Sequence, residues 1–426
     1  MKLSIKHTAV ACCIAYVSQA AVINLAPLFY TIMQNKYGVS LSELASLVLV
    51  MFITQIFVDI ASVKLVDGIG YRLSALIACA LMSAGLIMMG ILPRIPSFAY
   101  PGLFISVIVA SVGGGIVDCI ANPIVESLSE TGKASHLSLL HSCYSWGHVL
   151  VIGLTTLTLY VIGQGNWYFI PMAWALLSIV NFVMFMFVPL TETKQSEDGT
   201  SPKKLLFSKS FLVFAFIILC GGASEQVIAQ WSSLFAETGL GVPKVIGDLL
   251  GPCLFALFMA VGRTAYGVAG KKLKLKKAML LCSCATIFCY LLTVFGSNAV
   301  FSLAGCALSG FGVSLMWPGT ISMTSERIHG GPAMFGLCAF FGDIGCSLGP
   351  WLTGVVSDKV ISSETCLTLA DKLGISAEEL GLKSGILAGV LFPATMIVLI
   401  LLSDRVLKKT KKTSAHGDSK CIDQGK

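Results

Sequence analysis

The chain has 426 residues, of which 55% are hydrophobic and only 12% carry a charge. Soluble proteins contain about 25% charged residues, so this composition excludes an ordinary soluble enzyme and indicates a protein that crosses the membrane many times. The formal net charge of +7 is concentrated in loops and in the tail, which favours a role in membrane topology over nucleic-acid binding.

Each membrane-spanning helix needs about 20 apolar residues, and the sequence predicts about twelve such spans. They are residues 8–33, 41–63, 72–92, 100–126, 138–162, 167–190, 209–235, 245–270, 276–295, 299–325, 332–360 and 384–404. We therefore expect an all-α membrane protein with four parts. They are an N-terminal six-helix half (1–190), a cytoplasmic linker (191–208), a C-terminal six-helix half (209–404) and a basic cytoplasmic tail (405–426).

Lysine and arginine residues collect on one side of the predicted membrane, in the loops after spans 2 and 8, in the linker and at both ends of the chain. Cytoplasmic loops carry an excess of these residues, so both termini are expected to be cytoplasmic. The sequence thus predicts a multi-pass protein of the cell membrane, either a plasma membrane or a bacterial inner membrane. We expect a monomer that binds no cofactor.

The two halves repeat weakly. An offset of 195 positions carries Pro123 onto Pro318 and Gly147 onto Gly342. Two pseudo-symmetric six-helix halves around a central cavity are a common architecture of secondary transporters, and we predict that architecture here.

Polar side chains interrupt the apolar runs of the first half. Asp118 lies in span 4 with Asn122 on the same helical face, and His141 and Tyr144 share a face of span 5. We expect Asn122, His141 and Tyr144 to bind solute. Polar groups within the membrane are costly unless they face a cavity or one another. Burial disfavours the charged form of a carboxylate, so Asp118 is a candidate to load and release a proton. The alternative is an acid that a neighbouring helix holds permanently.

The second half of the sequence contains a similar set of polar side chains within its predicted spans. Glu225 in span 7 and Asp343 in span 11 are further intramembrane acids and candidates for proton coupling. Gln226 and Gln230 lie on a stripe next to Glu225, so we expect them to bind solute. Trp317 in span 10 could stack on the apolar face of a sugar ring, with helix packing as the alternative. Histidines without a cluster of further ligands predict no metal site.

We expect a gating role for three charged residues at the predicted cytoplasmic side. Asp59 lies near that end of span 2, and Asp67 and Arg72 belong to the short turn between spans 2 and 3. This turn resembles the G-x-L-x-D-R-x-G-R-R signature of the major facilitator superfamily, which it matches at Leu65, Asp67, Gly70 and Arg72, although the first glycine is absent.

Span 4 resembles a particular branch of that superfamily. The segment from Asp118 through Asn122 to Pro123 is similar to the E-T-A-A-N-P segment of fucose permeases, and LSLLH at 137–141 resembles the opening of their span 5. Glu225 followed by Trp231 resembles a G-x-E…W pattern in related sugar permeases. Fucose permeases also have an acid in span 1, where this chain offers only Gln19 and Asn24, the latter a candidate for solute binding.

The resemblance implies a secondary active transporter, not an enzyme, that imports a small polar solute with protons by alternating access. A monosaccharide is the expected solute, and the protein's other partners would be protons and the lipid bilayer. One alternative is an exporter of drugs or metabolites, although span 5 lacks the G-P-x-x-G-G stretch of proton antiporters in this superfamily. A second alternative is a non-transporting membrane sensor.

Overall fold

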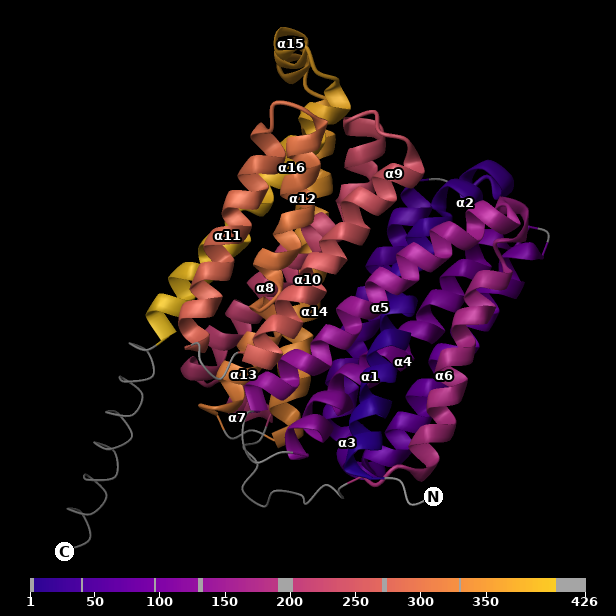
Figure 1. Ribbon diagram of the computed structural model, residues 1–426, viewed down its shortest axis with the longest axis vertical. Coiled ribbons are helices and arrows are strands. Elements are labelled where there is room, and N and C mark those ends of the chain that lie inside the picture. Colours follow the sequence, from indigo (N-terminus) through magenta and orange to yellow (C-terminus); the bar gives the residue numbers. More distant parts are fainter. Residues whose placement is uncertain are drawn as a thin grey trace, which may run out of the picture.

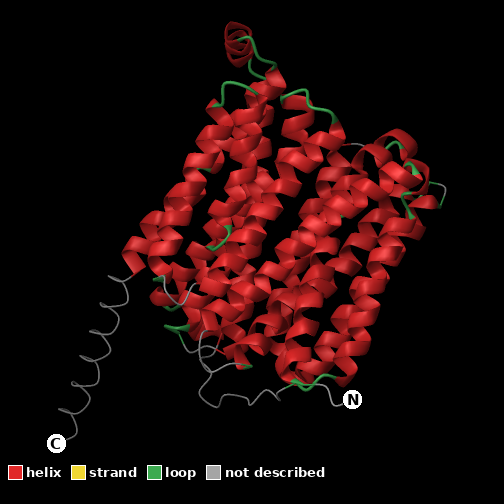
Figure 2. Ribbon diagram, in the orientation of Figure 1, coloured by secondary structure: helices red, strands yellow, loops and turns green. Residues whose placement is uncertain are grey.

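The computed structural model describes residues 4–39, 41–95, 97–128, 133–190, 202–269, 274–328 and 331–403. Within these ranges the ordered elements are helices, and no strand is present (Figure 2). The predicted all-α fold is therefore confirmed.

The first half of the chain forms six α-helices. They are α1 (Ile5–Asn24), α2 (Tyr30–Tyr37), α3 (Leu41–Ile91), α4 (Ala99–Ser127), α5 (Lys133–Ile162) and α6 (Phe169–Phe187). Short 3-10 turns at Ala26–Phe29, Leu92–Arg94 and Gln164–Asn166 connect them.

The second half contains the remaining helices. They are α7 (Pro202–Leu206), α8 (Lys209–Leu234), α9 (Lys244–Asp248), α10 (Leu254–Ala269), α11 (Leu275–Phe295), α12 (Ala299–Val313), α13 (Met316–Ser325), α14 (Gly331–Ile361), α15 (Glu364–Leu373) and α16 (Ala377–Gly389). Two π-helical turns, Phe235–Gly239 and Leu249–Cys253, flank α9.

Several helix ends follow from local sequence. Asn298 accepts a hydrogen bond from the backbone N–H of Phe301 at 3.1 Å and so caps α12, and Ser376 caps α16 through Glu379 at 3.0 Å. Gly374 ends α15 with φ of 67°, a left-handed conformation that glycine adopts readily.

The predicted spans agree well with the helices. Eleven described helical segments are long and apolar enough to cross a membrane, and the twelfth prediction, 41–63, contains the shorter apolar helix Ser46–Ala61. Spans 2 and 3 both belong to α3, which is interrupted at Gly70, where φ is 79°. The last span begins at Ala377, earlier than the predicted 384.

The helices form two bundles that follow the two halves of the chain. In the first, α3 packs against α4 and α6, and α1 packs against α5. In the second, α14 packs against α8 and α16, and α11 packs against α12. The bundles meet along two seams, α5 against α10 and α3 against α14. Figure 1 shows the first bundle in indigo to magenta beside the second in orange and yellow.

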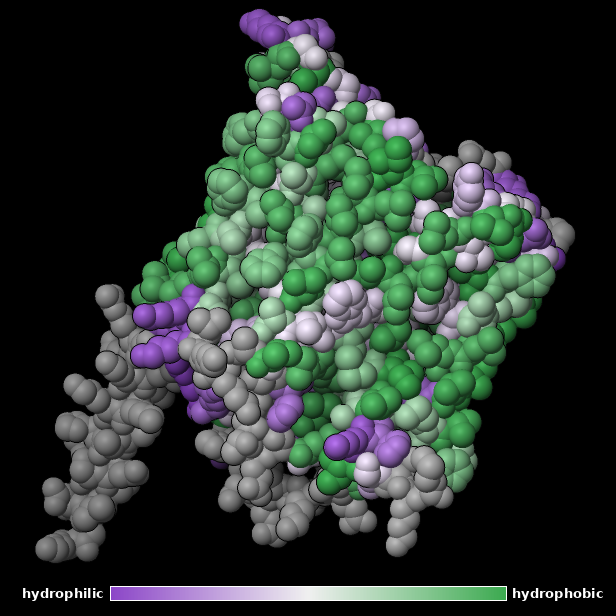
Figure 3. Space-filling model, in the orientation of Figure 1, coloured by the Kyte–Doolittle hydropathy of each residue, from purple (hydrophilic) through white to green (hydrophobic). Residues whose placement is uncertain are grey.

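The two ends of the molecule carry different elements. Figure 1 places α7 and α13 at one end, which we call the α7 end, and α2, α9 and α15 at the other, the α15 end. Between them, Figure 3 shows a broad hydrophobic face. Large apolar side chains of α11 and α12 such as Leu281, Phe288 and Val300 are 65–74% exposed, which is expected where a helix faces lipid.

Candidate functional site

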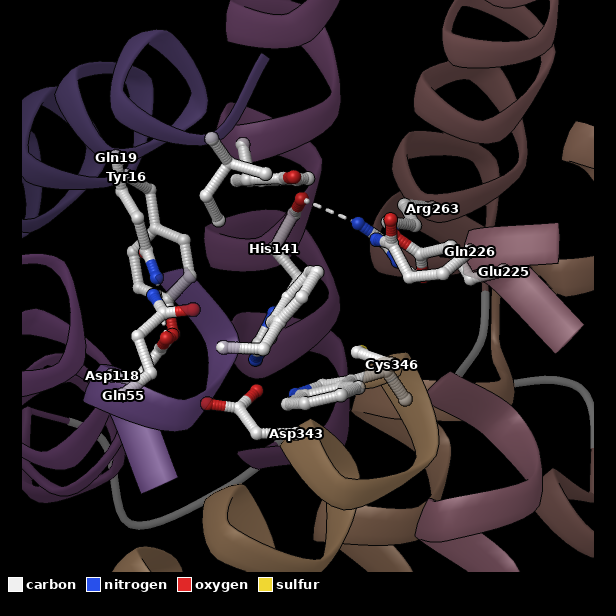
Figure 4. Close-up of a pocket in the computed structure, with 14 residues that line it drawn as sticks. Tyr16, Gln19, Gln55, Asp118, His141, Glu225, Gln226, Arg263, Asp343 and Cys346 are labelled. Carbon is white, nitrogen blue, oxygen red and sulfur yellow. Dashed lines mark hydrogen bonds and ion pairs between the residues drawn. The ribbon is translucent and has the colours of Figure 1, made fainter. Parts of the chain in front are cut away.

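A cavity with an empty volume of about 450 Å³ lies between the two bundles. Its lining comes from α1, α3, α4 and α5 on one side and from α8, α10, α13 and α14 on the other. The lining residues are Tyr16, Gln19, Ile23, Phe52, Gln55, Asp118, His141, Tyr144, Glu225, Gln226, Arg263, Trp317, Asp343 and Cys346 (Figure 4).

Asp118 forms the polar centre of the first bundle. Its carboxylate accepts a hydrogen bond from the side-chain amide of Gln19 on α1, and only 9% of the residue is exposed. Figure 4 shows Gln19, Gln55 and Asp118 close together on one wall of the cavity. Asp118 thus has a neutral donor as its described partner, which suits a carboxyl group that changes its charge.

His141 is held next to this group by Asn122. The Asn122 amide nitrogen donates to the backbone carbonyl of Asp118 at 3.0 Å, so its oxygen remains to accept from His141 Nε2 at 2.9 Å. With the Asn122 oxygen as the acceptor, His141 Nε2 is the donor of this hydrogen bond. The ring of Tyr16 packs edge-on against His141 with 5.0 Å between centroids. Asn122 positions a cavity residue but does not line the cavity itself.

Glu225 forms the centre of the second bundle, where it is paired with Arg263. The Arg263 Nη2 atom lies 2.7 Å from Glu225 Oε2, and the two side chains are 2% and 8% exposed. Arg263 also donates to the carbonyl of Ser314 at 3.0 Å and, across the bundles, to the Ser145 hydroxyl at 2.8 Å and the His141 carbonyl at 3.3 Å. The guanidinium thus joins α10 to α8 and to α5 of the other half.

Sequence reasoning did not identify Arg263. A base inside the predicted span 245–270 is the signal that could have identified it, because a charge at that depth needs a partner or a cavity. Gln55 was missed as well. It lies four residues before Asp59 on α3 and is 1% exposed, so the helical spacing of two polar residues was again the available signal.

Asp343 lines the cavity from α14 and is 5% exposed. Figure 4 shows its carboxylate directed into the cavity beneath His141. Within the described part of the chain this carboxylate has no hydrogen-bond or ion-pair partner. Asp59 is completely buried on α3, where it accepts from the Cys119 thiol at 3.5 Å.

Three residues predicted to bind solute lie outside the lining, namely Asn24, Asn122 and Gln230. Asn24 donates to the Tyr144 hydroxyl at 3.3 Å, and Gln230 donates to the Gln226 side-chain oxygen at 3.0 Å. Asn24 and Gln230 therefore each contact a residue that lines the cavity.

Arg72 of the predicted gate has a clear structural environment. Its guanidinium donates to the carbonyls of Phe185, Met186 and Val188 at 2.7–2.9 Å. These carbonyls end α6, so Arg72 caps that helix and complements its dipole. The side chain of Asp67 lies outside the described residues.

Comparisons with known proteins agree with this architecture. Residues 10–350 match the family model of the Major Facilitator Superfamily. Membrane protein MosC of Rhizobium meliloti is 24% identical over 336 residues, which cover 77% of this chain and 78% of MosC.

Solved structures share the fold. The E. coli fucose:proton symporter FucP superposes with a TM-score of 0.72 at 11% identity, covering 94% of this chain and 98% of that one. The proton:xylose symporter XylE bound to 6-bromo-6-deoxy-D-glucose gives 0.72 at 12% identity, covering 95% and 96%. A family match over most of the chain and this agreement in fold confirm the expectation from the sequence: the chain belongs to the Major Facilitator Superfamily.

Proposed function

We propose that this protein imports a small polar solute, a monosaccharide, together with protons across the cell membrane. The observation that carries the proposal is the position of Asp118, an acid on the wall of a cavity that both bundles line. Residues of both halves would bind a solute in that cavity. Rocking of the two halves about the cavity would then expose the solute to each side of the membrane in turn. The resemblance to fucose and xylose symporters in fold supports this class of solute.

Several polar groups of the cavity have separate roles in this proposal. Asp118 carries the proton, and His141, Tyr144 and Gln226 bind hydroxyl groups. Trp317 offers an aromatic face to the sugar ring. Glu225 and Arg263 together form a polar pair without a net charge on the second wall. The α7 end would face the cytoplasm, in agreement with the predicted positions of the termini.

Coupling follows if protonation of Asp118 changes the affinity for solute. The Gln19 amide donates to the Asp118 carboxylate, so loss of the negative charge weakens that bond and frees the amide. By linkage, a solute that binds better to the protonated form also increases the affinity for the proton. A proton gradient would then drive accumulation.

The test is uptake of radiolabelled hexoses into proteoliposomes with an imposed pH gradient. We expect Asp118→Asn to lose gradient-driven accumulation while it keeps exchange of internal for external solute at equal concentrations, since exchange needs no net proton movement. Asp371→Asn, an equivalent change at an exposed position on α15, should leave both activities intact. Undiminished accumulation by Asp118→Asn would disprove the proton role.

A further inference from the structure

The charges that line the cavity do not balance. Asp118, Glu225 and Asp343 contribute three carboxyl groups, and among the fourteen described lining residues Arg263 is the only Lys or Arg. Glu225 is already paired with Arg263 at 2.7 Å. The proton of the proposed transport cycle neutralises Asp118. This leaves Asp343, and a buried carboxylate without a partner is costly.

The surroundings of Asp343 point to a particular kind of partner. Trp317 lines the same cavity, and its ring packs against Gly342, the residue before Asp343. The ring also lies over Gly222, where an added Cβ would meet Trp317 Cζ3 at 3.2 Å, so small residues on α8 and α14 make room for it. A carboxylate beside an indole ring is suited to an organic ammonium group, which gains both an ion pair and a cation–π contact.

The unsatisfied polar atoms of the opposite wall agree with this requirement. Gln19 Oε1 and Gln55 Oε1 have no hydrogen-bond partner in the described structure, although the residues are only 2% and 1% exposed. Both atoms are acceptors, as is the Asp343 carboxylate. The Tyr16 hydroxyl on the same wall is unsatisfied as well and can either donate or accept. An ammonium group offers three donors and no acceptor, which suits the Asp343 carboxylate and the two amide oxygens.

We propose that Asp343 and Trp317 bind an ammonium group of the solute, so that the transported class is an amine-bearing sugar or polyol. The hydroxyl groups of such a solute would donate to Gln19 and Gln55, while its ammonium group neutralises Asp343. This inference rests on the proposed transport function and narrows its substrate class.

The test compares matched solutes on the purified full-length protein. Glucose, galactose and mannose are each paired with the 2-amino-2-deoxy sugar and with its N-acetylated form, which keeps the substituent but loses the charge. Binding is measured by the thermal shift in detergent at pH 7 as a function of solute concentration, and uptake is then measured in proteoliposomes. We expect at least one amino sugar to bind about tenfold or more tightly than both of its neutral partners, the size of effect of a hydrogen-bonded charge.

Asp343→Asn removes the charge and keeps the shape, so the amino sugar should lose its advantage of about tenfold over the neutral sugars. Asp358→Asn makes the same change at an exposed position on the same helix and should retain the preference. Trp317→Phe keeps a weaker aromatic face and should reduce the preference only in part.

The inference is overturned if no amino sugar binds better than its neutral partners, or if Asp343→Asn weakens both equally. A thermal shift produced by sodium ions and lost in Asp343→Asn, without any amine preference, would also overturn it, since the cation would then be inorganic. Transport of neutral sugars without amine preference would leave the proposed function standing. Amine binding without any translocation would sustain the inference and refute the transport function.

Discussion

Arg263 carries a positive charge at a depth where only 2% of its side chain is exposed. It keeps that position because Glu225 lies 2.7 Å away and because three further acceptors surround the guanidinium. Replacing one member of a buried ion pair leaves the other charge uncompensated, which typically costs about 3–5 kcal/mol. Replacing both members removes the penalty.

We therefore expect Arg263→Gln to lower the free energy of unfolding by about 3–5 kcal/mol and the double variant Arg263→Gln, Glu225→Gln to recover most of that loss. Thermal unfolding in detergent shows the order of stability of the variants. The pair Lys383–Glu379 on α16 is the control, with 2.7 Å between its charged atoms and side chains 13% and 17% exposed. Lys383→Gln should cost less than about 1 kcal/mol. Equal losses in Arg263→Gln and Lys383→Gln would contradict this account.

The sequence identified several cavity residues one at a time, because each acid or amide stands out in an apolar run. Asp118, His141, Glu225 and Asp343 line the cavity, whatever their roles prove to be. The sequence alone could not show which of these residues contact one another. Arg263 reaches Glu225 across 38 positions and Ser145 across 118, and helical spacing relates only residues that are a few positions apart.

Among the helices, α8 and α14 approach one another closely at a glycine. A Cβ added at Gly345 would collide with the backbone carbonyl of Leu219, and in the membrane such small residues let helix backbones pack directly. Gly153 on α5 is a matched contrast, since a Cβ there would meet no atom within 4 Å.

Gly345→Ala should therefore destabilise the protein by about 1–3 kcal/mol, because α8 and α14 must separate to admit the methyl group. Gly153→Ala should instead stabilise it by up to about 1 kcal/mol, because alanine favours the helix. The melting temperatures of the two variants in detergent should move in opposite directions. A shift of the same sign in both would show that the close approach does not matter.

Apolar runs predicted the number and approximate position of the spans, since a membrane requires each run to have a minimum length. They did not predict the π-helical turns at Phe235–Gly239 and Leu249–Cys253, nor the division of span 10 into α12 and α13. Hydropathy depends on side chains. These features are changes in the backbone hydrogen-bond pattern, which the packing of neighbouring helices decides.

At the scale of the molecule, the two bundles must move against one another if the protein transports. The seam between α5 and α10 holds them together through polar contacts. Ser138 donates to the Arg263 carbonyl at 2.8 Å, and Trp146 Nε1 donates to the Thr264 hydroxyl at 3.1 Å. These two neutral hydrogen bonds contribute only about 0.5–1.5 kcal/mol each. The Arg263 contacts to the Ser145 hydroxyl and to the His141 carbonyl cross the same seam, so they must also break when it opens.

A covalent bond across this seam should stop the cycle. A Cβ added at Gly267 on α10 would touch the side chain of Leu139 on α5, which is close enough for a disulfide between the two positions. We expect the double variant Leu139→Cys, Gly267→Cys to lose solute uptake on oxidation and to regain it with a reducing agent. Oxidised halves should remain joined on a non-reducing gel after cleavage at a protease site inserted between residues 191 and 208.

A disulfide within one bundle should have no such effect, because alternating access moves each bundle as a unit. Gly389 on α16 and Val227 on α8 provide this control, since a Cβ at Gly389 would lie 3.1 Å from a Val227 methyl group and both helices belong to the second bundle. Oxidised Val227→Cys, Gly389→Cys should transport at the rate of its reduced form. If the cross-linked α5–α10 seam instead leaves uptake unchanged, the bundles do not part there, and solute must reach the cavity without the rocking that the two-bundle architecture suggests.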